Sequence, residues 1–125
     1  MEKAIPIKFQ FGYAKGRDAI YLDTFIYLKE MSTLELRGEF NSELLTEYNG
    51  TFRWIKYQIV FINVKKYREF DFDDYDPVVS SDSSFEILNN SNWMNDNLQK
   101  HYKHFRLFTY DSVFEVICES YKVVI

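Results

Sequence analysis

Residues that interrupt an extended chain are scarce in this sequence. Its 125 residues include four glycines and two prolines, whereas phenylalanine, tyrosine and tryptophan together make up 19%. Aromatic residues are enriched in β-strands, and glycine and proline are depleted there. The balance predicts long strands rather than helices or loops. Because the length suits one domain, we expect residues 1–125 to form a single β-rich domain.

Disulfides, membrane spans and a basic surface are also missing. Cys118 is the sole cysteine, which excludes an internal disulfide and suits a reducing compartment. No apolar run approaches the length of about 20 residues that a membrane-spanning helix needs, and the first residues lack the apolar core of a signal peptide. The formal net charge of −4 disfavours nucleic acid and anionic membranes as partners. We expect a cytoplasmic protein whose partner, if charged, is basic.

Motifs of nucleophilic or phosphate chemistry are absent as well. The sequence has no Gly-x-Ser-x-Gly elbow and no glycine-rich phosphate loop. His101 and His104 are three residues apart, which in an extended segment places them on opposite faces, so a shared metal is not expected. For His104 we expect a cross-strand polar pair with Glu119 rather than a catalytic dyad. The sequence predicts a non-enzyme without a cofactor.

The pattern that is present most clearly is a C-terminal β-hairpin over residues 104–125. With Asp111 and Ser112 as a two-residue loop, antiparallel pairing sets Leu107 opposite Val116 and gathers the apolar residues on one face. The other face is mixed in polarity. The residues predicted to lie in the core are Phe105, Leu107, Phe114, Val116 and Cys118.

A change of phase follows within the last predicted strand. Up to Cys118 the apolar residues occupy even positions, and from Tyr121 they occupy odd positions. Alternation can shift in this way when a strand contains one extra residue. We therefore predict a β-bulge close to Glu119 and Ser120.

Period-two alternation marks further strands along the chain. The predicted ranges are 5–13, 20–28, 33–40 and 52–64. Pro6 lacks an N–H and places its strand at a sheet edge, whereas apolar residues on both faces of 59–62 predict a central strand. Asn41 is expected to cap one helical turn, Ser91 to cap a short helix over 91–100, and residues 85–88 to form a further turn. The predicted fold class is α+β, with a mainly antiparallel curved sheet or partial barrel of about six strands and one or two short helices.

An acidic run is the strongest local departure from average composition. It contains Glu69, Asp71, Asp73, Asp74 and Asp76. Alternation with Phe70 and Phe72 would place the first three carboxylates on one face, as a ridge for a basic partner, with Tyr67 and Tyr75 as aromatic contacts. A solvated rim is the alternative interpretation. A calcium loop is disfavoured because the run lacks the glycine turn and distal glutamate of an EF-hand.

Basic and aromatic residues are also mixed, at 52–54 and at 65–68. These are the ingredients of a single-stranded nucleic-acid platform, but the acidic balance of the chain argues against one. Trp54 and Trp93 are candidates for interface anchors, with core packing as the alternative.

Residues 84–94 and 108–117 resemble segments of small β-rich bacterial proteins, some of which are immunity proteins of polymorphic toxin systems. The resemblance implies a small cytosolic protein that binds and blocks a toxin domain, and it carries over no functional residue. The favoured hypothesis is therefore a protein-binding module of the immunity type. The alternative is a β-barrel that holds a small apolar ligand among its aromatic residues without catalysis.

Overall fold

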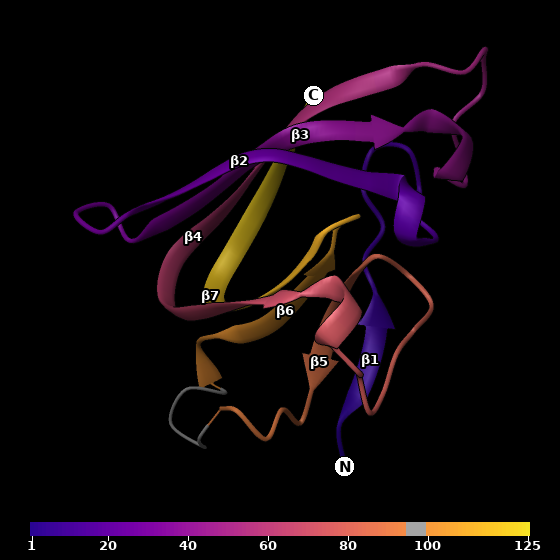
Figure 1. Cartoon of the computed structure of the whole chain (residues 1–125). Coiled ribbons are helices and arrows are strands. Elements are labelled where there is room, and N and C mark those ends of the chain that lie inside the picture. Colours follow the sequence, from indigo (N-terminus) through magenta and orange to yellow (C-terminus); the bar gives the residue numbers. More distant parts are fainter. Residues whose placement is uncertain (95–99) are drawn as a thin grey trace.

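The computed structural model describes residues 1–94 and 100–125 (Figure 1). Its strands are β1 (Lys3–Pro6), β2 (Ile20–Leu28), β3 (Thr33–Asn41), β4 (Trp54–Asp71), β5 (Phe85–Asn89), β6 (Lys103–Phe108) and β7 (Ser112–Val124). Three 3-10 turns lie wholly within these two ranges: η1 (Arg17–Ala19), η2 (Ser42–Leu44) and η3 (Phe72–Asp74). The fold is therefore all-β rather than α+β.

The predicted helices fare differently. Asn41 caps η2 as expected, because its side-chain oxygen accepts the N–H of Glu43 at 3.1 Å. The turn predicted at 85–88 is wrong, since these residues belong to strand β5. Of the helix predicted over 91–100, residues 91–94 form a turn, and 95–99 lie outside the described residues.

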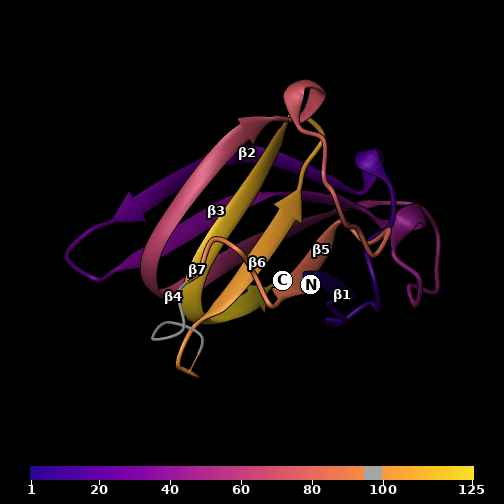
Figure 2. The same ribbon diagram turned by 90° about the horizontal axis from the view of Figure 1, so that it is seen from below.

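All strands join one antiparallel sheet in the order β1-β5-β6-β7-β4-β3-β2. β1 and β2 are the two edges, so the sheet is open and has seven strands where about six were predicted. Pro6 lies on an edge strand and β4 is central, both as predicted. The long strands β4 and β7 bend together, which curves the whole sheet (Figures 1 and 2).

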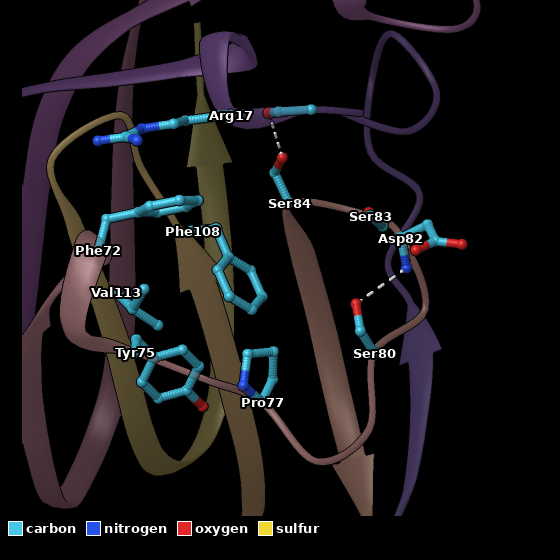
Figure 3. A pocket seen from close by; sticks show the side chains of 11 residues that line it. Arg17, Phe72, Tyr75, Pro77, Ser80, Asp82, Ser83, Ser84, Phe108 and Val113 are labelled. Atoms are coloured by element: carbon cyan, nitrogen blue, oxygen red, sulfur yellow. Dashed lines mark hydrogen bonds between the residues drawn. The ribbon is translucent and has the colours of Figure 1, made fainter.

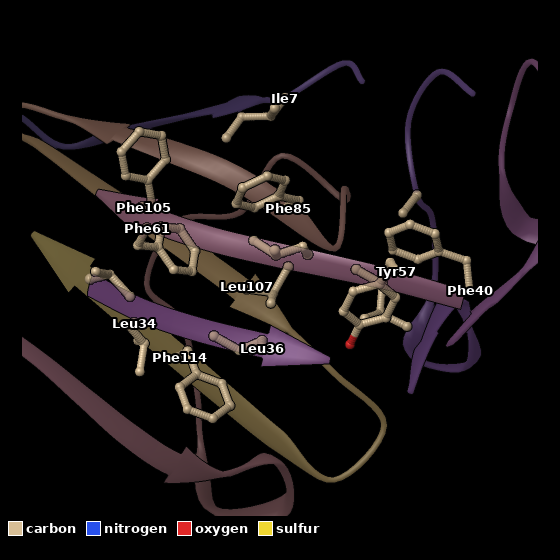
Figure 4. Packing of buried hydrophobic residues seen from close by; sticks show 14 of the residues in the cluster. Ile7, Leu34, Leu36, Phe40, Tyr57, Phe61, Phe85, Phe105, Leu107 and Phe114 are labelled. Carbon is tan, nitrogen blue, oxygen red and sulfur yellow. The ribbon is translucent and has the colours of Figure 1, made fainter. Parts of the chain in front are cut away.

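The inner side of the curve carries the hydrophobic core (Figure 4). Strands β2 to β7 contribute large side chains that are 1% exposed or less, among them Leu34, Phe61, Phe85, Leu107 and Phe114. Residues 7–14 cross one end of this core and join its two sides by backbone hydrogen bonds, because Ser84 N donates to Ala14 O at 2.8 Å and Thr46 N donates to Tyr13 O at 3.0 Å. The apolar face is therefore covered although the sheet does not close into a barrel.

The terminal hairpin has the predicted faces but a different register. Phe105, Leu107, Phe114, Val116 and Cys118 are all buried in the core, as expected. However, Leu107 pairs with Phe114, so the partner of each β6 residue lies two positions earlier than predicted. A shift of two residues keeps every side chain on its face.

A bulge occurs close to the predicted position along the sheet, but it lies on the neighbouring strand. Cys118 is buried and Tyr121 packs against the same core, so the phase of β7 does change between them. The register shift, however, falls between Val64 and Lys66 on β4. Nearby, Asn63 adopts a positive φ of 56° and its amide donates to Glu119 at 2.7 Å.

Strand β2 contains a second irregularity that the alternation did not show. Its pairing with β3 shifts between Leu22 and Thr24. Beyond that point the two faces exchange: Tyr27 packs against the core, whereas Ile26, which alternation from the buried Ile20 would place on the core side, is 53% exposed. One extra residue at Asp23 accounts for the exchange.

Truncating Val116 should test the assignment of the core face. Its side chain is completely buried, and removing two methyl groups there should lower the free energy of unfolding by about 1–3 kcal/mol. Val124 on the same strand is 44% exposed and supplies the control, for which Val124→Ala should cost less than about 0.5 kcal/mol. Urea denaturation measures both, and equal losses would contradict the assignment.

Candidate functional site

The outer face of the β6–β7 hairpin is buried too, and it holds charged side chains. His104 and Arg106 on β6, Glu115 on β7 and Glu86 on β5 are each 4% exposed or less. These positions alternate with the core residues and therefore point away from the core. The face of this hairpin that was predicted to be mixed in polarity is thus also buried. Because isolated buried charges are costly, each of them requires partners.

Arg106 and Glu86 form the centre of this buried network. The Arg106 Nε donates to Glu86 Oε1 at 2.9 Å, and the other carboxylate oxygen accepts the N–H and hydroxyl of Ser81 at 2.9 and 2.6 Å. Arg106 Nη1 donates to the Tyr75 hydroxyl at 3.0 Å, and Nη2 donates to the Val79 carbonyl. Burial alone would lower the Arg106 pKa, but the hydrogen bond and charge of Glu86 raise it. The guanidinium thereby fastens residues 75–81 over the hairpin.

Glu115 accepts hydrogen bonds from three side chains. Arg68 Nη2 and His104 Nε2 lie 2.9 and 2.8 Å from Glu115 Oε1, and the Tyr75 hydroxyl donates to Oε2. Burial would raise the pKa of Glu115, but the hydrogen bonds from His104, Tyr75 and Arg68 lower it to about 2. Burial and then the bond to Glu115 raise the pKa of Tyr75 to about 12. At neutral pH the carboxylate is ionised and the phenol is protonated.

Ser91, His104 and Glu115 lie in a series that resembles a hydrolytic triad. Ser91 Oγ is 2.6 Å from His104 Nδ1. Since an ionised carboxylate only accepts, Nε2 carries a proton toward Glu115, and a neutral ring then accepts from the Ser91 hydroxyl. Ser91 is only 2% exposed, and its Oγ also accepts the N–H of Trp93 at 3.2 Å. A hydroxyl in this position stabilises the turn and is out of reach of a substrate.

The cross-strand partner predicted for His104 is therefore wrong. Glu115, not Glu119, bonds the imidazole, because the register differs by two residues. Glu119 is exposed and accepts from Asn63 instead.

A polar pocket of about 390 Å³ opens beside the network and exposes parts of Arg68, His104 and Glu115. Trp93 lines it, with the Arg68 guanidinium 3.9 Å and the Lys66 ammonium 4.7 Å from ring centroids of the indole. The Trp93 ring is thus already covered by the side chains of Arg68 and Lys66. This does not favour a role for the ring as a stacking platform for nucleic-acid bases.

A second pocket, here called the aromatic pocket, has a volume of about 350 Å³ (Figure 3). Phe72, Tyr75, Phe108 and Val113 form its apolar wall, and a segment with Ser80, Asp82, Ser83 and Ser84 forms the opposite side. The Arg17 side chain lies across one end, 4.2 Å above the centroid of the Phe72 ring. The pocket is apolar on one side and able to form hydrogen bonds on the other.

Aromatic rings from three distant segments meet on the surface next to this pocket. Tyr110 stacks on Tyr21 with centroids 5.1 Å apart, Tyr21 contacts Trp54 edge-on at 5.1 Å, and Trp54 contacts Phe52 at 5.3 Å. Phe52, Trp54 and Tyr110 remain 43%, 47% and 39% exposed. We call these four residues the aromatic surface.

Carboxylates border the aromatic surface. Asp18 and Asp111 lie close enough to the Tyr21 phenol to raise its pKa, after burial as the main cause. Asp23 and Glu39 share a shallow hollow with Tyr21 and Trp54, and Lys56 pairs with Glu39 across the strands. Arg53 lies between Phe52 and Trp54 in the chain and is exposed, whereas Arg17 is bound to Asp73 at 3.0 Å. The border therefore carries charges of both signs, with carboxylates in the majority.

The predicted partner-binding residues are only partly gathered. Glu69, Asp71, Asp73, Asp74 and Asp76 are all exposed. Glu69 and Asp71 share a face of β4, but Asp73 and Asp74 lie on η3, where the strand has ended, so the carboxylates do not form one straight ridge.

Of the two tyrosines predicted as contacts, Tyr67 points inward, whereas Tyr75 turns its hydroxyl inward and lines the aromatic pocket with its ring. Tyr67 packs against the core and against Tyr27 at 5.3 Å, and Tyr75 belongs to the buried network. Sequence reasoning missed Tyr21 and Tyr110 as surface residues, and no local signal joins them, because 89 positions separate them along the chain. It did propose Trp54 as an interface anchor, which stays a prediction.

No family model and no curated protein matches the sequence, and no solved structure matches the fold. Within residues 1–94 and 100–125, no three His, Cys, Asp or Glu side chains cluster as a metal site would require. None of the helical turns in those ranges has the length and apolar character of a membrane span.

The buried carboxylate predicts how stability depends on acid. Because the folded-state pKa of Glu115 is about 2, below its ordinary 4.5, its contribution is complete above about pH 4.5 and is lost as the pH falls toward 2. We expect Glu115→Gln to lower the free energy of unfolding at pH 7 by about 1–3 kcal/mol, because an amide cannot replace the ionic acceptor.

The same variant should flatten the decline between pH 4.5 and 2. Glu119→Gln, on an exposed residue of the same strand, is the matched control and should retain the wild-type decline. Urea unfolding at pH 7, 4 and 3 compares them; the same pH profile for both variants would show that Glu115 does not supply this term.

Proposed function

We propose that this protein is a protein-binding module that contacts a basic protein partner through the aromatic surface. The observation that carries the proposal is the continuity of Phe52, Trp54, Tyr21 and Tyr110, whose rings contact one another while three of them stay about two-fifths exposed. Isolated exposed apolar residues are common on monomeric proteins, but contiguous aromatic groups mark interfaces. Tyrosine and tryptophan also dominate binding hot spots.

The charges beside these rings support a basic partner. Asp18, Asp23 and Asp111 lie at the aromatic surface, and the exposed carboxylates of η3 continue the negative border past Arg17. Such a border speeds encounter with a positively charged surface and disfavours acidic competitors.

The specific role we propose is that of a cytosolic immunity-type inhibitor. Toxin domains that attack nucleic acid have basic substrate clefts, in which carboxylates can imitate phosphates and aromatic rings can anchor the contact. The resemblance of residues 84–94 and 108–117 to segments of small β-rich bacterial proteins, some of which are immunity proteins, supports this role. Binding without catalysis agrees with a network whose serine hydroxyl is buried.

Trp54→Ala tests the aromatic surface directly. An immunity-type role requires an upstream gene for a large secreted protein with a variable C-terminal domain, and that domain is co-expressed with this protein. Wild type should restore growth and co-purify with the domain, whereas Trp54→Ala should weaken binding about tenfold or more, as truncation of a hot spot does.

Met31→Ala is the matched control, because Met31 is 68% exposed on the β2–β3 turn, away from the aromatic surface. It should bind as wild type does, and both variants should unfold at nearly the wild-type urea concentration. The immunity role fails if no such gene exists or if wild type neither binds the domain nor restores growth. Equal binding by Trp54→Ala would remove the aromatic surface from the interface.

Neutralising the acidic run tests the electrostatic part of the proposal. Changing Asp71, Asp73 and Asp74 to Asn should slow association with the same domain at low salt and reduce the dependence of the rate on ionic strength. The dissociation rate should change little, because exposed border charges act mainly through steering. Stopped-flow association at several salt concentrations measures this, and unchanged rates would identify the run as a solvated rim.

A further inference from the structure

We infer that the aromatic pocket receives one aromatic side chain of the basic partner, which makes it the anchor point of the interface. This inference rests on the proposed function and adds where and how the partner is held. The three rings of the wall come from η3, the residue after it and strand β6, and the Phe108 ring meets each of the other two edge-on (Figure 3). Phe108 contacts Phe72 at 6.3 Å and 73°, and Tyr75 at 5.8 Å and 70°.

The wall is fixed before any partner arrives. The Tyr75 hydroxyl is bound to both Glu115 and Arg106 in the buried network. Phe72 is held by its N–H, which donates to Asp111 O at 3.0 Å, and by the Arg17 guanidinium above its ring. A pocket whose side chains are already ordered loses little conformational entropy on binding.

Arg17 connects the pocket to the aromatic surface. Its Nε donates to Tyr110 O at 2.9 Å, and its guanidinium lies 4.2 Å from the Phe72 centroid and 4.9 Å from the Tyr110 centroid. Pocket and surface are thus neighbouring parts of one face, which favours occupation by the same partner.

The size and chemistry of the pocket favour an aromatic side chain. About 350 Å³ is near the lower end of ligand pockets and accommodates one large ring. Rings gain from edge-to-face contact with aromatic walls, and the Ser80 hydroxyl on the other side can accept an indole or phenol proton. Asp82, whose exposed carboxylate points away from the aromatic wall (Figure 3), and the Asp73 on Arg17 would face basic residues flanking that ring.

Short peptides test the inference with the isolated protein. The first is an acetylated, amidated heptapeptide with a central tryptophan flanked by glycines and two pairs of lysines. The others replace the tryptophan by alanine or the lysines by glutamates, and free indole is the small-molecule probe. Binding is followed through the backbone amide signals of the ¹⁵N-labelled protein.

We expect the tryptophan–lysine peptide to shift the amides of Gly16, Ser84 and Val113 at the pocket. The alanine peptide should bind about tenfold more weakly, and the glutamate peptide and free indole should also bind more weakly. Phe72→Ala removes one wall of the pocket and should weaken binding of the tryptophan–lysine peptide to the level of the alanine peptide. Phe25→Ala, at a phenylalanine 40% exposed on β2, is the matched control and should not. Ser80→Trp, which fills the pocket from its exposed side, is a second test if Phe72→Ala is unstable.

The contrary outcomes separate the two proposals. If both lysine peptides bind equally and shift only amides around Tyr21 and Asp111, the pocket inference fails and the proposed function stands. If the glutamate peptide binds as well as the lysine peptides, the proposed basic partner fails with it. If indole alone binds as tightly as the tryptophan–lysine peptide, the pocket serves a small apolar ligand and the inference is overturned.

Discussion

Charge burial on the outer face of the β6–β7 hairpin is the constraint on which the aromatic pocket and the polar pocket depend. Arg106, Glu115 and Glu86 cannot stay dry without partners, and residues 72–84 supply them through Tyr75, Val79 and Ser81. The segment between η3 and β5 has few apolar residues and no regular secondary structure, so these bonds take the place of a hydrophobic contact in holding it to the sheet. Its attachment in turn creates the aromatic pocket on one side and the polar pocket on the other, and both are lined by Tyr75.

Alternation predicted the faces of the sheet well because side-chain direction has a period of two. The core residues of the terminal hairpin were identified from it, but the register was not, since a shift of two leaves every face unchanged. The register is decided by the turn: Thr109 N donates to Ser112 O at 2.7 Å, and the Thr109 hydroxyl accepts from Ser112 N at 2.9 Å. The bulge at Asp23 escaped the same reasoning because apolar residues occupy both even and odd positions of β2, so the sequence shows no change of phase.

The candidate site was less predictable than the core. Tyr75 stands among five carboxylates in the sequence, which suggested a surface residue, yet a buried arginine and a buried glutamate draw its hydroxyl inward. Those partners come from β6 and β7, about 30 to 40 positions further along the chain. The aromatic surface poses the same difficulty, because the pairing of strands far apart in sequence brings its residues together. Composition could predict that aromatic residues are important in this protein. Only the topology of the sheet decides which of them lie on the surface.

The core itself places one of those rings. Tyr57 is buried, which raises its pKa well above the ordinary value, so its phenol stays protonated and donates to Tyr21 O at 2.8 Å. Gly38 permits this approach, because a Cβ at that position would lie 1.9 Å from the same carbonyl oxygen and 2.8 Å from the Tyr57 hydroxyl. The carbonyl of Tyr21 is therefore fixed from within while its ring lies outside between Tyr110 and Trp54. A surface positioned by the core in this way keeps its geometry without a partner, and this rigidity is what a preorganised binding face requires.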